Sequence, residues 1–329
     1  MQKILLIRVG QLGDMVMITP ALDALLERYP EATVAVLTSA DGKRLLQRYH
    51  PRMGEGHVYN RRSWLPWREK RRIRQWIRNQ QFDFIVCLET KASFAQLYAD
   101  TSARSVTLPA DEPTPVVHYA QRCLDLVAPQ RDRFYPVHVP VSDAGLAQSN
   151  ALFAEHGIGP DDLVIGFHPS FSHLGKGRRG RAVAHHKFWP VASWGALAIA
   201  LREYATQQQR KLHIVMDLLP EDRALGEEIV NAARGGITMW IPPLHFERYT
   251  ATLARFDIFI CPDTGPMHLA AAVGTNVVAL FSGKDPLDCG PYVAEDKRIL
   301  LRAECSTHPE LGLAGITPAA VMEAVKIWI

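Results

Sequence analysis

The chain has 329 residues, of which 47% are apolar, 22% charged and 9% aromatic. This composition is typical of a soluble globular protein and excludes the fibrous, intrinsically disordered and membrane-spanning classes. The formal net charge is +3, from 37 Lys and Arg against 34 Asp and Glu, which is too small for the whole molecule to bind nucleic acid as a polycation. A length near twice the usual domain size favours two domains.

The charge distribution and the cysteine content indicate what the protein contacts and in which compartment it works. Residues 1–150 contain 20 basic and 15 acidic side chains, whereas residues 151–329 contain 17 and 19, so we expect the first half to contact anions. The five cysteines show no CxxC spacing, which predicts reduced thiols without a disulfide scaffold or a zinc site. No apolar run is long enough for a signal peptide or a membrane span, and we therefore expect a cytoplasmic protein.

Apolar runs of strand length alternate with helical periodicity along the first half of the chain. The predicted strands are Lys3–Val9, Thr33–Thr38, Phe82–Leu88 and Ser105–Leu108, with a helix over Pro20–Tyr29. Because these runs are continuously apolar, they predict a parallel sheet that is covered by helices on both faces.

A break is expected at about residues 140–161, where a turn-forming cluster of Gly157, Gly159 and Pro160 marks a domain boundary, and a second series of the same kind follows. Its predicted strands are Leu163–Phe167, Leu212–Met216, Ile237–Ile241, Asp257–Cys261 and Val277–Phe281, with helices at 190–204, 220–234 and 246–255. The sequence thus predicts an α/β protein with a Rossmann-like domain over 1–155, a second over 156–315, and a closing helix within 316–329 that is capped by Thr317.

The first predicted strand ends in the turn Gly10-Gln11-Leu12-Gly13-Asp14. This turn lacks the third glycine of the dinucleotide-binding fingerprint, and the chain contains no P-loop motif. It does place a carboxylate, Asp14, at the carboxyl end of a parallel strand, where open α/β sheets bind ligands. Asp14 is therefore a candidate base, with helix capping as the structural alternative.

The segment Ile258–His268 joins an apolar strand to an Ala-rich helix through the polar turn Asp263-Thr264-Gly265. Thr264, Gly265 and the following amides are predicted at a helix N-terminus, which binds phosphate through free N–H groups and the helix dipole. Capping of the helix by Asp263 and Thr264 is the alternative interpretation.

No metal ion is expected, because the chain has no Asp-x-Asp pair after a strand and no HxxxH spacing. If the ligand contains a diphosphate, side-chain cations must then neutralise its charge, and Lys187 is the candidate. It ends a Gly- and Arg-rich segment, Ser170–Lys187, that we interpret as a binding loop or lid, with a solvated insertion as the alternative.

Residues 61–78 contain eight basic residues, one acidic residue and three tryptophans. A basic and aromatic surface of this kind is able to bind single-stranded nucleic acid by charge and stacking. The helical spacing of Ile73, Trp76 and Ile77 favours instead a helix docked on the domain, whose arginines face an anion or a membrane surface.

Four motifs, in this order, resemble the ADP-heptose–lipopolysaccharide heptosyltransferases of glycosyltransferase family 9. They are Lys3–Pro20, His186–Pro190, Pro262–Ala272 and Ile316–Val325. The resemblance implies the GT-B fold, in which two Rossmann-like domains with parallel sheets face each other across a cleft. It also implies an inverting, metal-independent transfer of heptose from ADP-heptose to an anionic lipopolysaccharide core acceptor, with the ADP-sugar as a substrate and no cofactor.

The same resemblance implies roles for individual residues. Asp14 would deprotonate the acceptor hydroxyl, and Gly13, Arg61 and Arg62 would bind the acceptor. The donor would be held by Lys187 at the diphosphate, Asp263 at the sugar hydroxyls, Thr264 and Gly265 at the phosphate, Glu221 or Asp222 at the ribose, Met239 to Pro242 at the adenine, and His268.

The Gly/Arg stretch at 175–181 departs from the family pattern and implies a different acceptor or lid motion. The alternatives are a family 9 enzyme with another nucleotide sugar or acceptor, a nucleotide-sugar epimerase, or a nucleic-acid-binding module that uses residues 61–78. The expected partners are a nucleotide sugar, an anionic glycolipid and the inner face of the inner membrane, but not nucleic acid. We expect the chain to act as a monomer.

Overall fold

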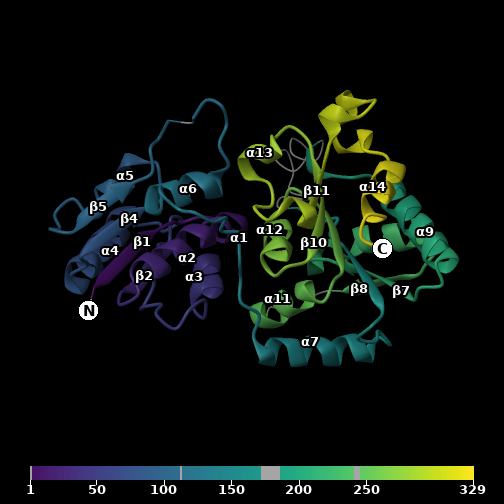
Figure 1. The fold of residues 1–329 in the computed structure, drawn as a ribbon, viewed down its shortest axis with the longest axis horizontal. Helices are drawn as coiled ribbons and strands as arrows, with labels where there is room; N and C mark the ends of the chain where they lie inside the picture. Colours follow the sequence, from purple (N-terminus) through teal and green to yellow (C-terminus); the bar gives the residue numbers. More distant parts are fainter. Residues whose placement is uncertain (1, 112, 172–185, 241–244) are drawn as a thin grey trace. The chain divides into compact units, whose positions relative to one another are not determined.

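A computed structural model describes residues 2–111, 113–171, 186–240 and 245–329 (Figure 1). The chain divides into two compact units, which are Met1–Pro140 with Leu287–Tyr292, and Val141–Pro286 with Val293–Ile329. Each unit contains one parallel sheet. Within the described part of the chain, no helix is both long and apolar enough to span a bilayer.

The first unit has a five-stranded sheet in the order β3-β2-β1-β4-β5. Its elements in chain order are β1 (Lys3–Ile7), α1 (Leu12–Val16), α2 (Thr19–Arg28), β2 (Thr33–Thr38), α3 (Ala40–Leu46), β3 (His57–Val58), α4 (Pro66–Gln80), β4 (Phe84–Cys87), α5 (Ala92–Ala95), β5 (Arg104–Thr107) and α6 (Tyr119–Val127). The last four residues of β1 are all buried, so the strand is covered on both faces. On one face Leu5 and Ile7 share a core with Ile73 and Ile77 of α4.

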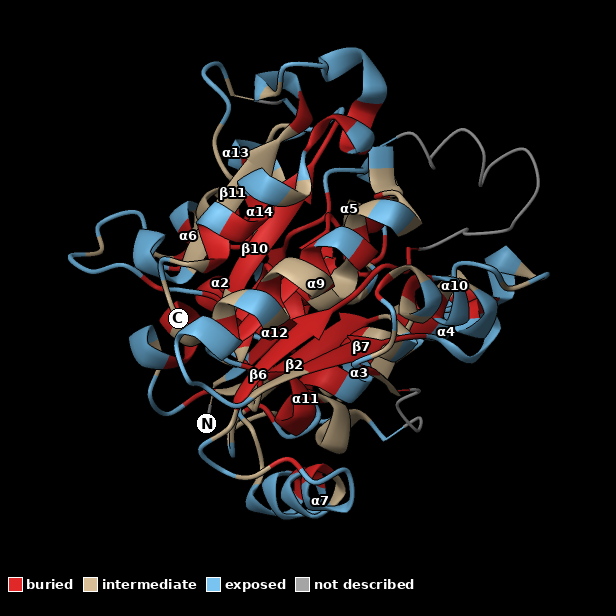
Figure 2. Cartoon of the chain, turned by 90° about the vertical axis from the view of Figure 1, so that its right-hand side faces the viewer, coloured by how far each residue is buried: buried red, intermediate tan, exposed pale blue. Residues whose placement is uncertain are grey.

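The second unit has a six-stranded sheet in the order β11-β10-β9-β6-β7-β8. Its elements are α7 (Asp143–Glu155), β6 (Leu163–Phe167), α9 (Val191–Gln207), β7 (Leu212–Asp217), α10 (Arg223–Ala232), β8 (Ile237–Trp240), α11 (Phe246–Ala254), β9 (Ile258–Pro262), α12 (Gly265–Ala272), β10 (Asn276–Phe281), β11 (Arg298–Arg302) and α14 (Pro318–Val325), while α13 (Pro286–Cys289) crosses the division between the units. Figure 2 shows buried strands in the middle of this unit and exposed surface on α7 and α9. Phe167, Trp189 and Trp194 are almost fully buried in its core.

The predicted α/β class with two Rossmann-like domains is confirmed, because both sheets contain the parallel order 3-2-1-4-5 of that fold when their strands are numbered from the start of each unit. The sequence analysis missed β3 and β11. β3 has only two residues, and β11 is a half-buried edge strand that begins and ends with arginine, so neither gives a strong apolar signal.

The division between the units falls after Pro140, whereas the sequence analysis placed the domain boundary after residue 155. The glycine cluster that suggested residue 155 instead ends α7. Gly157 has a φ of +70° and Ile158 donates its N–H to the carbonyl of Phe153, a common helix C-cap arrangement. Phe153 packs against Trp240, so α7 belongs to the second unit. The closing helix α14 begins after Thr317, whose side chain accepts the Ala320 N–H as predicted.

Each sheet reverses its strand order at one point. In the first unit β1 lies between β2 and β4, and in the second unit β6 lies between β7 and β9. The crossover helices leave the sheet in opposite directions at such a point, which opens a crevice beyond the carboxyl ends of the two central strands. Residues that directly follow β1 and β4, or β6 and β9, are therefore placed where ligands bind.

Close packing at Gly166 in β6 gives a stability prediction. A Cβ atom at this position would lie 2.5 Å from the Phe256 ring and 2.7 Å from the Phe259 ring. We expect Gly166→Ala to lower the free energy of unfolding by about 1–3 kcal/mol, measured by urea denaturation. Gly159→Ala is the matched control, because its Cβ would make contacts of 3.4 Å or longer. Equal midpoints for the two variants would contradict this packing.

Candidate active site

Asp14 lies in the first turn of α1, just past the carboxyl end of β1. Its Oδ1 accepts a hydrogen bond from Arg8 Nη2 at 2.8 Å, and its Oδ2 accepts the Gln11 N–H at 2.8 Å. A Cβ atom on Gly10 would lie 2.3 Å from the Cβ of Asp14, so the turn requires glycine there. Asp14 therefore does cap α1, but its carboxylate is also fixed by an arginine and keeps 34% of its side chain exposed.

Arg8 connects Asp14 to a second carboxylate. Its guanidinium lies over the Tyr119 ring at 4.7 Å, and Nη1 is 3.7 Å from Glu89 Oε1. Burial on its own lowers the pKa of Arg8, but the phenol and carboxylate neighbours outweigh burial and raise that pKa above its ordinary value. Arg8 is therefore a permanent positive charge beside Asp14.

Glu89 follows β4 on the other side of the reversal point and is 5% exposed. Its Oε1 accepts the Val9 N–H at 2.8 Å and a hydrogen bond from Arg61 Nη2 at 2.7 Å. The Arg61 guanidinium also lies over the Phe94 ring at 4.9 Å. Glu89 thus joins the candidate base, through Arg8, to a predicted acceptor-binding arginine.

The structure places the other predicted acceptor residues differently. Arg62 is exposed, and its main-chain N–H donates to Asn60 Oδ1 at 3.0 Å. Gly13 is buried within α1, where its carbonyl accepts the Met17 N–H. Arg8 and Glu89 were missed by the sequence analysis, although both are charged residues directly after apolar strands, and that position is the signal that could have found them.

In the second unit, Lys187 contacts Asp263 at the carboxyl end of β9. Lys187 Nζ donates to the main-chain oxygen of Asp263 and to its Oδ2, the latter at 3.0 Å. The two side chains are 25% and 13% exposed. The predicted donor-binding cation and carboxylate are therefore brought together from segments far apart in the sequence.

Thr264 precedes α12 but does not cap it with its side chain. Its Oγ1 is buried, and within the described residues it has no hydrogen-bond partner. Gly265 is the first helical residue, and its N–H is among the amides that an α-helix leaves without an internal acceptor. A buried hydroxyl next to free amides is costly unless a ligand or water accepts hydrogen bonds there. Phosphate oxygens fit this site.

A buried polar network lies at the carboxyl ends of β6 and β7. His168 Nδ1 is 2.9 Å from Asp217 Oδ2, and the Tyr249 hydroxyl donates to the same oxygen at 2.7 Å. Burial and then the charge of Asp217 raise the pKa of Tyr249 well above its ordinary value, so the phenol stays protonated. Ser170, two residues after His168, is buried, and its Oγ has no hydrogen-bond partner in the described ranges. The sequence analysis missed this network.

The remaining residues that were predicted to bind the donor differ in how far they are buried. Glu221 is exposed, whereas Asp222 is 6% exposed and its Oδ2 is unpaired among the residues that the structure describes. Met239 is half-buried in β8, and His268 is buried in α12. Pro242 and the 175–181 stretch lie outside the described residues.

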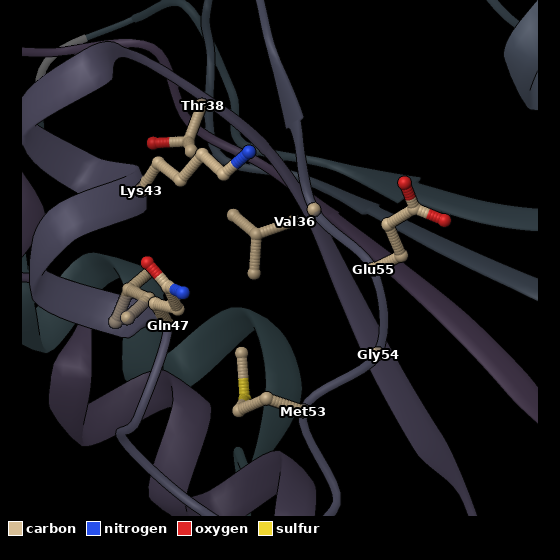
Figure 3. A pocket seen from close by; sticks show the side chains of 9 residues that line it. Val36, Thr38, Lys43, Gln47, Met53, Gly54 and Glu55 are labelled. Carbon is tan, nitrogen blue, oxygen red and sulfur yellow. The ribbon is translucent and has the colours of Figure 1, made fainter.

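A cavity of about 240 Å³ lies elsewhere in the first unit, among β2, α3 and the segment that precedes β3 (Figure 3). Val36 and Met53 line its apolar interior, with Lys43 and Glu55 on either side. None of the predicted site residues lines it. In the described ranges, no three His, Cys, Asp or Glu side chains gather as a metal site would need.

The model of glycosyltransferase family 9 (heptosyltransferase) matches residues 70–312. The chain belongs to glycosyltransferase family 9. Family membership makes it a glycosyltransferase, which takes the place of the epimerase alternative. A similar curated protein is lipopolysaccharide heptosyltransferase 2 of Salmonella typhimurium, which is 24% identical over 98% of this chain and 97% of its own.

Solved structures agree with this assignment at the level of fold. A family 9 glycosyl transferase from Veillonella parvula superposes with a TM-score of 0.82 at 18% identity, covering 99% of this chain and 96% of its own. E. coli ADP-heptose LPS heptosyltransferase II superposes with a TM-score of 0.72 at 20% identity, covering 99% and 98%. The predicted GT-B fold class is thereby confirmed.

The contact between Arg8 and Asp14 gives a prediction for this glycosyltransferase. Arg8→Met removes the cation that fixes Asp14 Oδ1, so we expect the rate of glycosyl transfer to fall about 10- to 100-fold while donor affinity is unchanged. Arg8→Lys keeps the charge and should restore part of the rate. Steady-state kinetics with donor titration measure both effects. A methionine variant with the parent rate would show that Asp14 does not depend on Arg8.

Proposed function

We propose that this chain is an inverting, metal-independent heptosyltransferase, which moves heptose from ADP-heptose to an anionic lipopolysaccharide core acceptor at the cytoplasmic face of the membrane. The observation that carries the proposal is the geometry of Asp14, a partly exposed carboxylate fixed at both oxygens beside the β1–β4 reversal point. The names of the relatives support the sugar and the acceptor, since they include a lipopolysaccharide heptosyltransferase and an ADP-heptose enzyme.

In the proposed reaction Asp14 takes the proton of the acceptor hydroxyl as the acceptor oxygen attacks the anomeric carbon of the donor sugar. The new bond forms between that oxygen and the anomeric carbon. The bond from the anomeric carbon to the diphosphate breaks, and its electron pair leaves with ADP. A single displacement of this kind inverts the configuration at the anomeric carbon and needs no covalent sugar–enzyme intermediate.

Charge that develops on the leaving diphosphate needs partners, which the second unit offers. Lys187 supplies a cation, and Gly265 with the buried Thr264 hydroxyl supplies donors at the N-terminus of α12. Fixed donors of this kind stabilise a leaving anion without a metal ion. Asp263 would bind sugar hydroxyls, and the burial of Asp222 favours it over Glu221 for the ribose.

The acceptor is assigned to the first unit because of its arginines. Arg61 presents a planar fork that matches phosphate and carboxylate groups, and Glu89 with the Phe94 ring holds it in place. Glu89 is also close to Arg8 and to the Val9 amide. An anionic acceptor at Arg61 would thus bind near the charges that orient Asp14.

Asp14→Asn tests the assignment of the base. The amide keeps the size of the side chain but cannot accept the acceptor proton, so we expect kcat to fall at least about 100-fold while ADP binding is retained. Transfer is measured by product mass spectrometry and ADP binding by calorimetry. Asp100→Asn, an exposed carboxylate of the same unit, is the control and should behave as the parent. Turnover of Asp14→Asn within a few-fold of the parent would overturn the role.

Lys187→Ala tests how the diphosphate is held. We expect it to raise the donor KM and to slow transfer, because the cation beside Asp263 is lost, and we expect the parent enzyme to stay active in excess EDTA. Arg61→Ala is the comparison and should raise the acceptor KM alone. A strict requirement for Mg²⁺ or Mn²⁺, or a donor KM that only Arg61→Ala changes, would contradict these assignments.

A further inference from the structure

Helix α4 has one face packed on the sheet and one face in solvent. Ile73 and Ile77 are 0% and 1% exposed and belong to the core of the first unit. On the opposite side of the helix lie Trp67, Arg71 and Arg78, which are spaced by whole helical turns and are all exposed. The outer face of α4 is therefore a continuous stripe that begins with an aromatic residue and continues with cations.

The tryptophan side chains at the N-terminal end of this stripe are largely exposed to solvent. Trp64, just before α4, is 89% exposed, and Trp67 in its first turn is 58% exposed. Within the described residues Trp64 is the most exposed of the large apolar side chains. Two neighbouring tryptophans in water are costly for a protein that acts alone, and exposed apolar groups next to cations mark an interaction surface.

Helix α4 itself presents no exposed carboxylate. Glu69 is the only acidic residue of α4, and it is 9% exposed and hydrogen-bonded to Arg72 and to the Asn60 amide. Burial by itself would raise the pKa of Glu69, but these hydrogen bonds outweigh burial and lower that pKa. The negative charge of Glu69 is therefore compensated by partners within the protein.

At the far end of the stripe Arg78 pairs with the exposed Asp100, at 2.6 Å between Nη2 and Oδ2. Arg68 and Arg71 have no ion-pair partner among the described residues and are thus left to meet an anionic partner.

We infer that Trp64, Trp67, Arg68 and Arg71, here called the α4 surface, bind the anionic surface of a lipid bilayer. Tryptophan rings favour the depth between lipid headgroups and acyl chains, while arginines stay with the phosphates. The order of residues fits this partner, because the two exposed tryptophans lie at the N-terminal end of α4 and the cations continue along it.

A bilayer fits this surface better than single-stranded nucleic acid. Base stacking needs an open ring face, and on Trp67 the guanidinium of Arg68 already covers one face, at 5.1 Å from the ring centre, so that Trp64 is the one fully open ring of the pair. A bilayer interface needs no such face, because the ring edge and its N–H enter the headgroup layer. The inference extends the proposed function, since it names how the enzyme reaches a lipid-linked acceptor, yet binding is measured without donor or acceptor.

The test is co-sedimentation of the full chain with phosphatidylcholine vesicles that contain or lack phosphatidylglycerol. We expect binding only to the anionic vesicles, and weaker binding at high salt. Trp64→Ala with Trp67→Ala should lower the partition coefficient on the order of tenfold, and Arg68→Glu with Arg71→Glu should lower it at least about fivefold per position. Transfer to a short acceptor without acyl chains should be unchanged in both variants.

Matched controls separate this surface from general charge. Arg44→Glu with Arg48→Glu changes the net charge equally on exposed positions of the same unit and should keep most of the vesicle binding. Equal losses in the two charge variants, no preference for anionic vesicles, or tight oligonucleotide binding that the tryptophan variant abolishes would overturn the inference. Loss of transfer in Asp14→Asn with intact vesicle binding would leave the inference standing, whatever becomes of the proposed reaction.

Discussion

The reversal of strand order between β1 and β4, and again between β6 and β9, is the constraint on which both candidate sites depend. Parallel strands end at the same edge of a sheet, so polar residues that follow adjacent strands meet there even when they are distant in sequence. Asp14 and Glu89 follow one such pair of strands, and His168 and Asp263 follow the other. The apolar strands before them fix where these side chains emerge.

In the first unit, the site depends on a buried carboxylate between two cations. Glu89 is shielded from water, and a charge in that position is stable only with close partners. Its partners are Arg61, Arg8 and the Val9 amide. Because Arg8 also contacts Asp14, a change at Glu89 should be felt at the carboxylate that the proposed reaction uses.

The second unit differs in its buried oxygen atoms, because those side-chain oxygens without hydrogen-bond partners that the described residues contain all lie there. In its described part, the hydroxyls of Thr264 and Ser170 and one carboxylate oxygen of Asp222 are buried without hydrogen bonds. Leaving such groups unpaired costs free energy in folding, and a ligand that pairs with them recovers that cost as binding energy. In the proposal, a donor that bonds to these atoms would recover that cost as binding energy.

The sequence by itself determined the fold class and singled out several candidate site residues. Continuous apolar runs predicted the parallel sheets. Asp14 and the Asp263-Thr264 pair were singled out because each lies in the turn after an apolar strand. Periodicity and turn chemistry are local properties, so neighbouring residues are enough to read them. They could not assign α7 to the second unit, because the glycines after it serve equally well as a helix end or a domain boundary.

Only the tertiary structure decided which side chains meet. The pairing of Glu89 with Arg8 and Arg61 joins residues that follow three different strands, and the network of His168, Asp217 and Tyr249 joins two strands and a helix. Such contacts depend on strand order and register, which no local pattern encodes. Burial decided the rest: the spacing of Ile73 and Ile77 already predicted a docked helix with outward arginines, but only the structure showed that Trp64 and Trp67 are exposed beside them.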